Sequence, residues 1–344
     1  MFGKVIHHIQ QWLFNIWYKN SYWYIFFLPL SWLFASLVLV RKFVFKRFFQ
    51  NLYQPPCSVI IVGNITVGGT GKTPFIIWLA KNMKARGLKP AILSRGYGGE
   101  ISDTPIEVSE YSDPSIVGDE PVMIASKVDC PVIVHSNRVL SCKYISKKNI
   151  DLIICDDGLQ HYMLKRDYEI VIIDGERVFG NGQLLPAGPL REPISRLKNV
   201  DLVLKQINPV FGGVDYDRER AFYLTGGTAN NINSGETRSL SEFIGKKIHA
   251  VAGIGNPNRF FNLLEGKGME IERHYYGDHQ KYSLDELSFD DDLDILMTEK
   301  DAVKCKKFNN DRLWYVPVEL EFTNDSQEWL VDIENLVKIR DTND

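Results

Sequence analysis

The residues best suited to chemistry form a glycine-rich run, Gly63-Asn-Ile-Thr-Val-Gly-Gly-Thr-Gly-Lys-Thr73, between an apolar segment and an amphipathic one. Strand, glycine loop and helix in this order are the context of a phosphate-binding loop. Glycines let backbone N–H groups approach phosphate oxygens, and the start of the helix adds partial positive charge. We expect Lys72 to bridge the β- and γ-phosphates as a catalytic residue and Thr73 to hold magnesium. The predicted nucleotide-binding residues are Thr66, Gly68, Gly69, Thr70, Gly71, Lys72 and Thr73.

The loop departs from the usual spacing at one position. The common pattern would place a glycine at position 66, where this chain has Thr66. The plain structural alternative is a glycine turn in front of a helix. Three glycines followed by Lys-Thr favour phosphate binding over that alternative.

A second nucleotide element is the apolar run Asp151–Cys155, which ends in Asp156 and Asp157. Carboxylates at the end of a buried strand are how a Walker B motif reaches magnesium, and buried acidic residues are seldom needed for packing. We predict both aspartates as metal residues. Because side chains alternate along a strand, the two cannot point the same way while the strand continues.

These motifs require a parallel α/β sheet to position them. Short apolar runs alternate with amphipathic segments after Pro56, which predicts a doubly wound sheet. Ligands of such sheets bind beside the carboxyl ends of the strands, where several polar clusters of this sequence would lie. The expected strands are Ser58–Val62, Pro90–Leu93, Pro131–Val134, Asp151–Cys155, Glu169–Ile173 and Asp201–Leu204, and the expected helices are Lys72–Arg86, Glu120–Lys127 and Arg138–Lys147.

The fold class we predict is α/β, with a P-loop NTPase-type parallel sheet domain, a smaller second α/β domain and an N-terminal membrane-associated helix. A Gly- and Asn-rich stretch from residue 226 to 235 interrupts the pattern before a second α/β series begins. The predicted parts are an N-terminal segment (1–49), the nucleotide-binding domain (50–224), a linker (225–245) and the smaller domain (246–344).

The N-terminal segment is the outlier in composition. Tyr22–Val40 contains 19 residues without a charge, close to bilayer-spanning length, and Arg41, Lys42, Lys46 and Arg47 follow it. The basic residues predict that the following domains stay cytoplasmic. The helix either spans the membrane or lies at its surface, and the alternative is a buried helix of a soluble domain.

The composition of the chain argues against two classes of protein, nucleic-acid binders and zinc proteins. A formal net charge of −3 is not that of a dedicated nucleic-acid binder, so we expect no nucleic-acid partner. Five scattered cysteines with no CxxC pair predict reduced core residues and no zinc framework.

The motifs GNITVGGTGKTP, SRGYGG, GDEP, DDGLQHY, FGNGQLLPAGPLRE, AGIGNP, DHQ and MTEKDAVK occur in this order along nearly the whole chain. In these motifs the chain resembles the tetraacyldisaccharide 4'-kinase family. The resemblance implies transfer of the γ-phosphate of ATP, with Mg²⁺, to the 4'-hydroxyl of tetraacyldisaccharide 1-phosphate in lipid A biosynthesis. It also implies a location at the inner membrane, with the catalytic domains on the cytoplasmic side.

The resemblance assigns catalytic roles to Asp119, in the GDEP motif, and to His279, in the DHQ motif. A carboxylate with an imidazole beside it can take the proton of a sugar hydroxyl as the bond to phosphorus forms. The alternative for Asp119 is a helix cap, and for His279 an ordinary surface histidine. The substrate-side residues predicted with them are Arg95, Glu120, Gln160, His161, Arg191 and Glu192.

Two other functions stay open from the sequence alone. One is a membrane-associated P-loop ATPase switch of the partitioning or targeting type, although Val67 stands where that class carries an extra lysine. The other is a membrane scaffold that binds nucleotide without turnover. Transfer of phosphate to lipid would separate the kinase from both.

Overall fold

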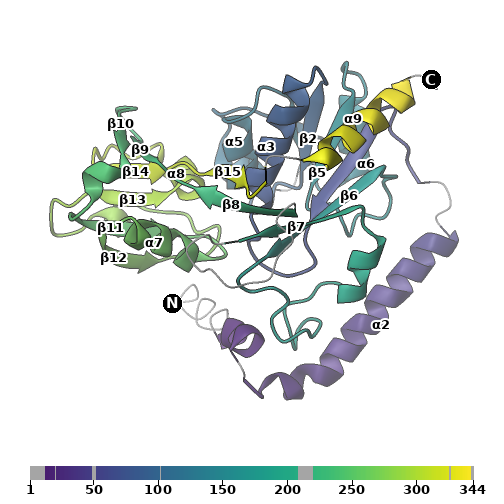
Figure 1. The fold of residues 1–344 in the computed structure, drawn as a ribbon, viewed down its shortest axis with the longest axis horizontal. Coiled ribbons are helices and arrows are strands. Elements are labelled where there is room, and N and C mark those ends of the chain that lie inside the picture. Colours follow the sequence, from purple (N-terminus) through teal and green to yellow (C-terminus); the bar gives the residue numbers. More distant parts are fainter. Residues whose placement is uncertain are drawn as a thin grey trace.

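The computed structural model describes residues 12–19, 21–48, 52–100, 102–207, 220–324 and 327–341. Two sheets form two adjoining domains, and a long N-terminal helix runs along the outside of the larger one (Figure 1). The residues outside this description are 1–11, 20 and 49 of the predicted N-terminal segment, 50–51, 101 and 208–219 of the predicted nucleotide-binding domain, and 325–326 and 342–344 of the predicted C-terminal domain.

The larger sheet has nine strands in the order β15-β8-β7-β6-β1-β5-β2-β4-β3, parallel except where β3 and β15 pair at the two edges. The predicted strands and helices of this domain are present, with ends that differ by at most two residues. Its strands are β1 (Ser58–Gly63), β2 (Pro90–Ser94), β3 (Ile106–Val108), β4 (Val132–Val134), β5 (Leu152–Asp156), β6 (Tyr168–Asp174), β7 (Leu202–Gln206), β8 (Ala221–Thr225) and β15 (Glu319–Phe322). Its helices are α3 (Lys72–Ala85), α4 (Pro114–Val117), α5 (Asp119–Ala125), α6 (Arg138–Ile145), α9 (Glu328–Asp341) and the 3-10 turn Ile194–Asn199.

Both faces of this sheet are buried, which explains why its strands are almost continuously apolar. On β1, Ile60 and Val62 pack toward α3 and α9, while Val59 and Ile61 pack on the opposite side, which α6 covers. The resulting rigid sheet presents the carboxyl ends of its strands along one edge.

The smaller sheet has six strands in the order β10-β9-β14-β13-β11-β12. β11 to β14 are parallel, and β9 and β10 add antiparallel pairs. Its elements are β9 (Thr228–Asn231), β10 (Thr237–Ser239), β11 (Lys247–Ala252), α7 (Pro257–Gly266), β12 (Glu270–Tyr275), β13 (Ile295–Thr298), α8 (Glu299–Cys305), β14 (Leu313–Val316) and the 3-10 turns Leu240–Phe243 and Asp285–Leu287.

The domain boundaries differ from those expected. Residues 225–245 are not a linker, because β9 and β10 belong to the smaller sheet. The end of the chain does not belong to the smaller domain, because β15 pairs with β8 and α9 packs its Trp329 against Phe75 of α3. Strand pairing between segments far apart in the sequence leaves no signal in the local sequence. The turn-rich stretch 226–235 alone therefore predicted both boundaries wrongly.

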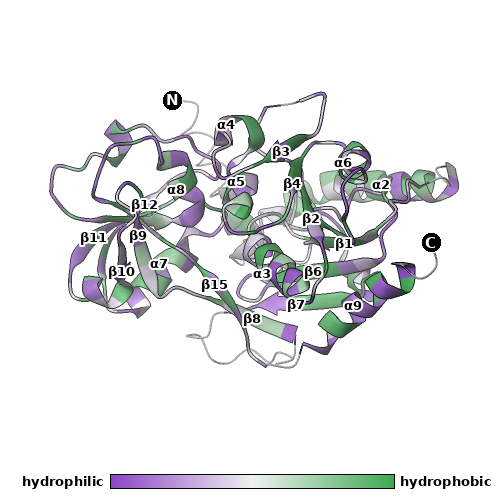
Figure 2. Ribbon diagram, turned by 90° about the horizontal axis from the view of Figure 1, so that it is seen from above, coloured by the Kyte–Doolittle hydropathy of each residue, from purple (hydrophilic) through white to green (hydrophobic). Residues whose placement is uncertain are grey.

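The N-terminal helix α2 (Tyr24–Phe48) is largely hydrophobic (Figure 2) and continues through Pro29. Within the described residues, Tyr24–Phe45 is the stretch long and apolar enough to cross a membrane, and Ser31 is its one buried residue. Ser31 ties it to the main body, since its hydroxyl donates to Leu184 O and accepts from Ala187 N. The exposed apolar face of α2 is consistent with membrane association.

Candidate active site

A cavity of about 1170 Å³ lies between the two domains and contains most of the predicted site residues. The larger domain contributes the glycine loop and the strand ends of β2 and β5. The smaller domain contributes the segments that follow β11, β12 and β13. Its wall includes Gly71, Lys72, Thr73, Arg95, Glu120, Asp156, Asp157, Arg191, Gln206, Arg259, Asp278, His279 and Lys300.

The glycine loop leaves β1 and ends at Gly71, which precedes α3. Gly71 has a φ of 81°, which favours glycine, and a β-carbon there would collide with the end of the Gln206 side chain. Lys72 Nζ lies 3.1 Å from Asn64 Oδ1 and 3.5 Å from Asp157 Oδ1. The lysine is therefore held over the loop, in position for a phosphate.

Asp156 and Asp157 both reach the cavity, although they are neighbours on the chain. Asp156 ends β5 and accepts from Ser94 Oγ at 3.1 Å, whereas Asp157 has left the strand with a φ of 49°. Burial, and next to it the charge of Glu120, raise the pKa of Asp156 to about 6. Burial acts the same way on Asp157, but Lys72 and Arg191 outweigh it and lower its pKa to about 2.

Asp119 and His279 meet across the domain interface. His279 Nδ1 lies 2.9 Å from Asp119 Oδ1, although the two residues are 160 positions apart. Asp119 is only 4% exposed and sits behind the imidazole, which faces the cavity. Burial would raise the pKa of Asp119, but His279 and the ammonium groups of Lys300 and Lys304 bring it below its ordinary value.

The pKa of the His279 imidazole is shifted in the opposite direction, upward. Burial would lower the pKa of His279, but the hydrogen bond to Asp119 outweighs it, and the net shift is upward. His279 also has a φ of 60°, which is uncommon outside glycine. Gly98 of the SRGYGG motif makes room for it, since a β-carbon on Gly98 would lie 3.3 Å from His279 Nδ1.

Lys300 completes the polar wall of the smaller domain. Its ammonium lies 2.8 Å from Glu120 Oε1 and 2.9 Å from Asp278 Oδ1. It is also 3.5 Å from His279 Nε2. Burial would lower the pKa of Lys300, but Glu120 and Asp278 keep it above its ordinary value, so the charge persists beside the imidazole.

Besides Asp119, which lies behind His279, four predicted residues are not part of the cavity wall. Thr66 is buried and forms a β-bridge with Leu190. Gln160 donates to Glu192 Oε1 at 2.9 Å, and both contact α2: Lys42 lies 2.6 Å from Glu192 Oε2, and Arg41 donates to Gln160 O.

The fourth of these residues is His161, whose Nε2 has no hydrogen-bond partner among the described residues. Burial, followed by the charges of Arg138 and Arg166, lowers the pKa of His161 to about 4. The imidazole is thus neutral at physiological pH, in a cationic neighbourhood beside α2.

The sequence did not single out several residues that the structure brings to the site. Asn64 follows β1, Gln206 ends β7, and Arg259 lies 2.6 Å from Gln206 Oε1 and 2.9 Å from Asp174 Oδ2. Lys300 lies in the MTEKDAVK motif, so the order of family motifs was the signal that pointed to it. Gln206 carried no such signal, because only strand order places β7 beside the glycine loop.

Taken together, a phosphate-binding loop on a parallel sheet, paired carboxylates at the next strand end and a carboxylate–imidazole pair across the cavity define a P-loop phosphotransferase. The family model described as "LpxK: Tetraacyldisaccharide-1-P 4'-kinase" matches residues 23–335. The chain belongs to this family and is accordingly a kinase of lipid A biosynthesis, acting on the 4'-hydroxyl of a tetraacyldisaccharide 1-phosphate.

Known relatives agree with this assignment. The tetraacyldisaccharide 4'-kinase of Methylobacillus flagellatus is 46% identical over 316 residues, covering 91% of this chain and 92% of the relative. That of Nitrosococcus oceani is 44% identical over 307 residues, covering 88% of each. The crystal structure described as the "apo" form of LpxK from Aquifex aeolicus in complex with ATP has a TM-score of 0.76 and 25% identity, covering 91% of this chain and 99% of that one.

Proposed function

We propose that this kinase uses ATP with Mg²⁺, that Asp119 and His279 together deprotonate the sugar hydroxyl, and that the reaction takes place at the cytoplasmic face of the inner membrane. The observation that carries the proposal is the Asp119–His279 pair, which faces the glycine loop across one cavity. The similar LpxK structure from Aquifex aeolicus is a complex with ATP, which supports the choice of nucleotide.

The residues around the glycine loop suit a nucleotide and a hard cation. Thr73, Asp156 and Asp157 offer oxygen donors of the kind that Mg²⁺ prefers. Burial and the charge of Glu120 raise the pKa of Asp156, and a cation bound there would favour its ionised form. When bound, Mg²⁺ neutralises charge on the β- and γ-phosphates. Lys72 and the N–H groups of the loop would hold the same phosphates.

The imidazole of His279 would accept the proton of the sugar hydroxyl. The Asp119 carboxylate accepts a hydrogen bond from His279 Nδ1, which leaves the lone pair of the neutral ring on Nε2, the nitrogen that faces Lys300 Nζ at 3.5 Å and would accept the proton. The imidazolium that forms is stabilised by the carboxylate behind it. The geometry favours this relay because His279, and not Asp119, lies on the cavity wall.

The remaining predicted residues divide into two groups. Arg95, Glu120 and Arg191 line the cavity, where the arginines suit phosphate oxygens and Glu120 holds Lys300. Gln160 and Glu192 contact Arg41 and Lys42 of α2, and we assign them, with the neighbouring His161, to the path along which the lipid headgroup enters.

The test of the reaction is transfer of labelled γ-phosphate from ATP to tetraacyldisaccharide 1-phosphate in detergent micelles, with and without Mg²⁺. We expect labelled lipid from the wild type only with Mg²⁺, and severe loss in Lys72→Ala. Hydrolysis of ATP without labelling of the lipid would contradict the proposal and favour the ATPase switch.

The membrane assignment has a separate test that keeps the chain intact. Leu33 and Leu37 are 58% and 60% exposed on α2, so Leu33→Asp/Leu37→Asp should detach the protein from vesicles while ATP binding persists. The matched control is Tyr111→Asp, which places a charge at an exposed apolar side chain of the larger domain. Unchanged vesicle binding by the α2 variant would refute the assignment.

A further inference from the structure

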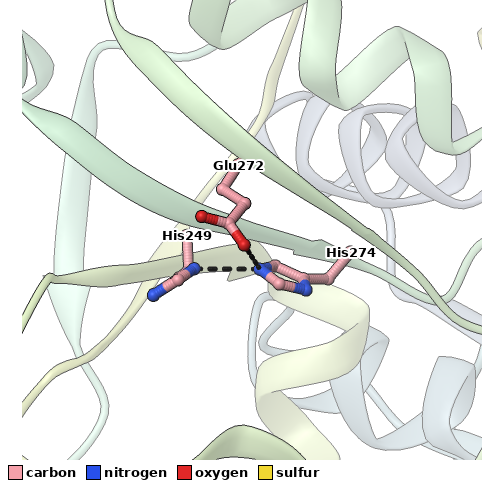
Figure 3. Close-up of side chains that lie close together, drawn as sticks. All are labelled: His249, Glu272 and His274. Carbon is pink, nitrogen blue, oxygen red and sulfur yellow. Dashed lines mark hydrogen bonds and ion pairs between the residues drawn. The ribbon is translucent and has the colours of Figure 1, made fainter. Parts of the chain in front are cut away.

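The smaller sheet carries a cluster of potential metal ligands that the phosphotransfer site does not use. His249 lies on β11, and Glu272 and His274 lie on the neighbouring edge strand β12 (Figure 3). His249 is in register with Glu272 in the parallel pair, and His274 follows two residues later. Since side chains two residues apart share a face of the sheet, all three project to the same side. None of them lines the cavity between the domains.

The donor atoms of these three residues converge. His249 Nδ1 lies 2.9 Å from His274 Nε2, and His274 Nε2 lies 4.0 Å from Glu272 Oε1. All three donor atoms lie within 4.8 Å of one another. Four ligands around Zn²⁺ at ordinary bond lengths stand about 3.3 Å apart. The glutamate side chain is 48% exposed, and its Oε2 lies 3.5 Å from Lys247 Nζ, so the carboxylate must turn from this surface ion pair to close the remaining distance.

A second carboxylate fixes the orientation of the buried imidazole. His249 Nε2 lies 2.9 Å from Asp291 Oδ1, and because a carboxylate only accepts, this nitrogen carries the proton. In the neutral ring the lone pair of His249 is then on Nδ1, which points toward His274. A carboxylate that orients a histidine in this way is the usual outer partner of a metal-bound imidazole.

Aromatic packing keeps the imidazoles in place. Phe289 stacks on His249 with ring centroids 3.8 Å apart and covers His274 at 4.3 Å. His249 is buried whereas Glu272 is exposed, which leaves the cluster open to solvent on one side.

We propose that His249 Nδ1, His274 Nε2 and the Glu272 carboxylate bind one divalent transition-metal ion of the Zn²⁺ type, with Asp291 as the outer partner of His249. Two imidazoles and one carboxylate select such ions over Mg²⁺, which prefers oxygen ligands. A fourth position faces solvent at Glu272 and is available to water. The ion would clamp the edge strand β12 to β11, so its role is structural and separate from phosphate transfer.

The test is titration of the full-length chain, without a histidine tag, with Co²⁺ in excess Mg²⁺. Excess Mg²⁺ occupies oxygen-donor sites, and Co²⁺ reports a tetrahedral site through its visible absorption. We expect one equivalent to bind and to be displaced by Zn²⁺. Glu272→Gln and His274→Gln should weaken binding at least tenfold, and Asp291→Asn by about 10-fold to 100-fold.

The matched control is Glu270→Gln, which removes an exposed carboxylate from the same face of β12 and should leave the affinity unchanged. Kinase activity of each variant shows that the chain has folded, since none of these residues lines the active-site cavity. In the wild type, Zn²⁺ should also raise the melting temperature, and in His274→Gln it should not. Equal affinity in wild type and His274→Gln, or no binding by the wild type, overturns the proposal.

Discussion

Replacing Asp119 by asparagine tests the active-site pair most directly, because it removes the charge and keeps the shape. The asparagine oxygen can still accept from His279 Nδ1, which Asp119 Oδ1 meets at 2.9 Å. What is lost is the carboxylate that raises the pKa of His279 and stabilises the imidazolium. General-base catalysis contributes about 10²-fold to 10⁴-fold, so we expect a loss of that size in kcat. In free energy this is about 3 to 5 kcal/mol of barrier.

The assay is transfer of labelled phosphate to lipid, combined with a separate measurement of ATP binding. Because Asp119 does not line the cavity, ATP affinity should be preserved. The matched control is Asp113→Asn: Asp113 caps α4 through Ser115 N at 2.8 Å and should leave kcat unchanged. Combining Asp119→Asn with His279→Gln should cost little more than either change alone, since residues that act as a unit are not additive. Retention of more than about a tenth of the activity by Asp119→Asn would refute the reasoning, because even the low end of a base contribution is larger.

Three further predictions concern the loop, the titration of the base and the C-terminal helix. Gly71→Ala should weaken ATP binding at least tenfold in a nucleotide titration, because its β-carbon would collide with Gln206; unchanged affinity would contradict the tight fit. Activity should fall as pH drops through the raised pKa of His279, since the neutral ring is the base. In Asp119→Asn the midpoint of the pH–rate profile should move to lower pH, and an unmoved midpoint would exclude that Asp119 raises the pKa of His279. Trp329→Ala should lower the free energy of unfolding by about 3 to 5 kcal/mol in a denaturant titration, because this buried indole joins α9 to the larger domain; a loss below about 1 kcal/mol would argue against that packing.

The sequence predicted the features that depend on neighbouring residues. The glycine loop, the apolar strand before it and the two aspartates at the end of β5 are local patterns, and the structure has the strands and helices of the larger domain within two residues of the predicted ends. The strands of a parallel sheet are buried on both faces, so each appears in the sequence as a short, continuous apolar run that can be recognised without the structure. The helix near the N-terminus is equally visible, because 19 consecutive residues without a charge are also a local pattern.

Only the tertiary structure decided which distant segments meet. Residues 225–245 joined the smaller sheet and β15 with α9 returned to the larger one, because backbone pairing and aromatic packing chose partners far away in sequence. The folded chain also set His279 in front of Asp119 and directed Glu192 toward α2 instead of the cavity. Local composition determines what a segment can form, whereas the partner it buries against is chosen among all segments at once, and that choice builds the site.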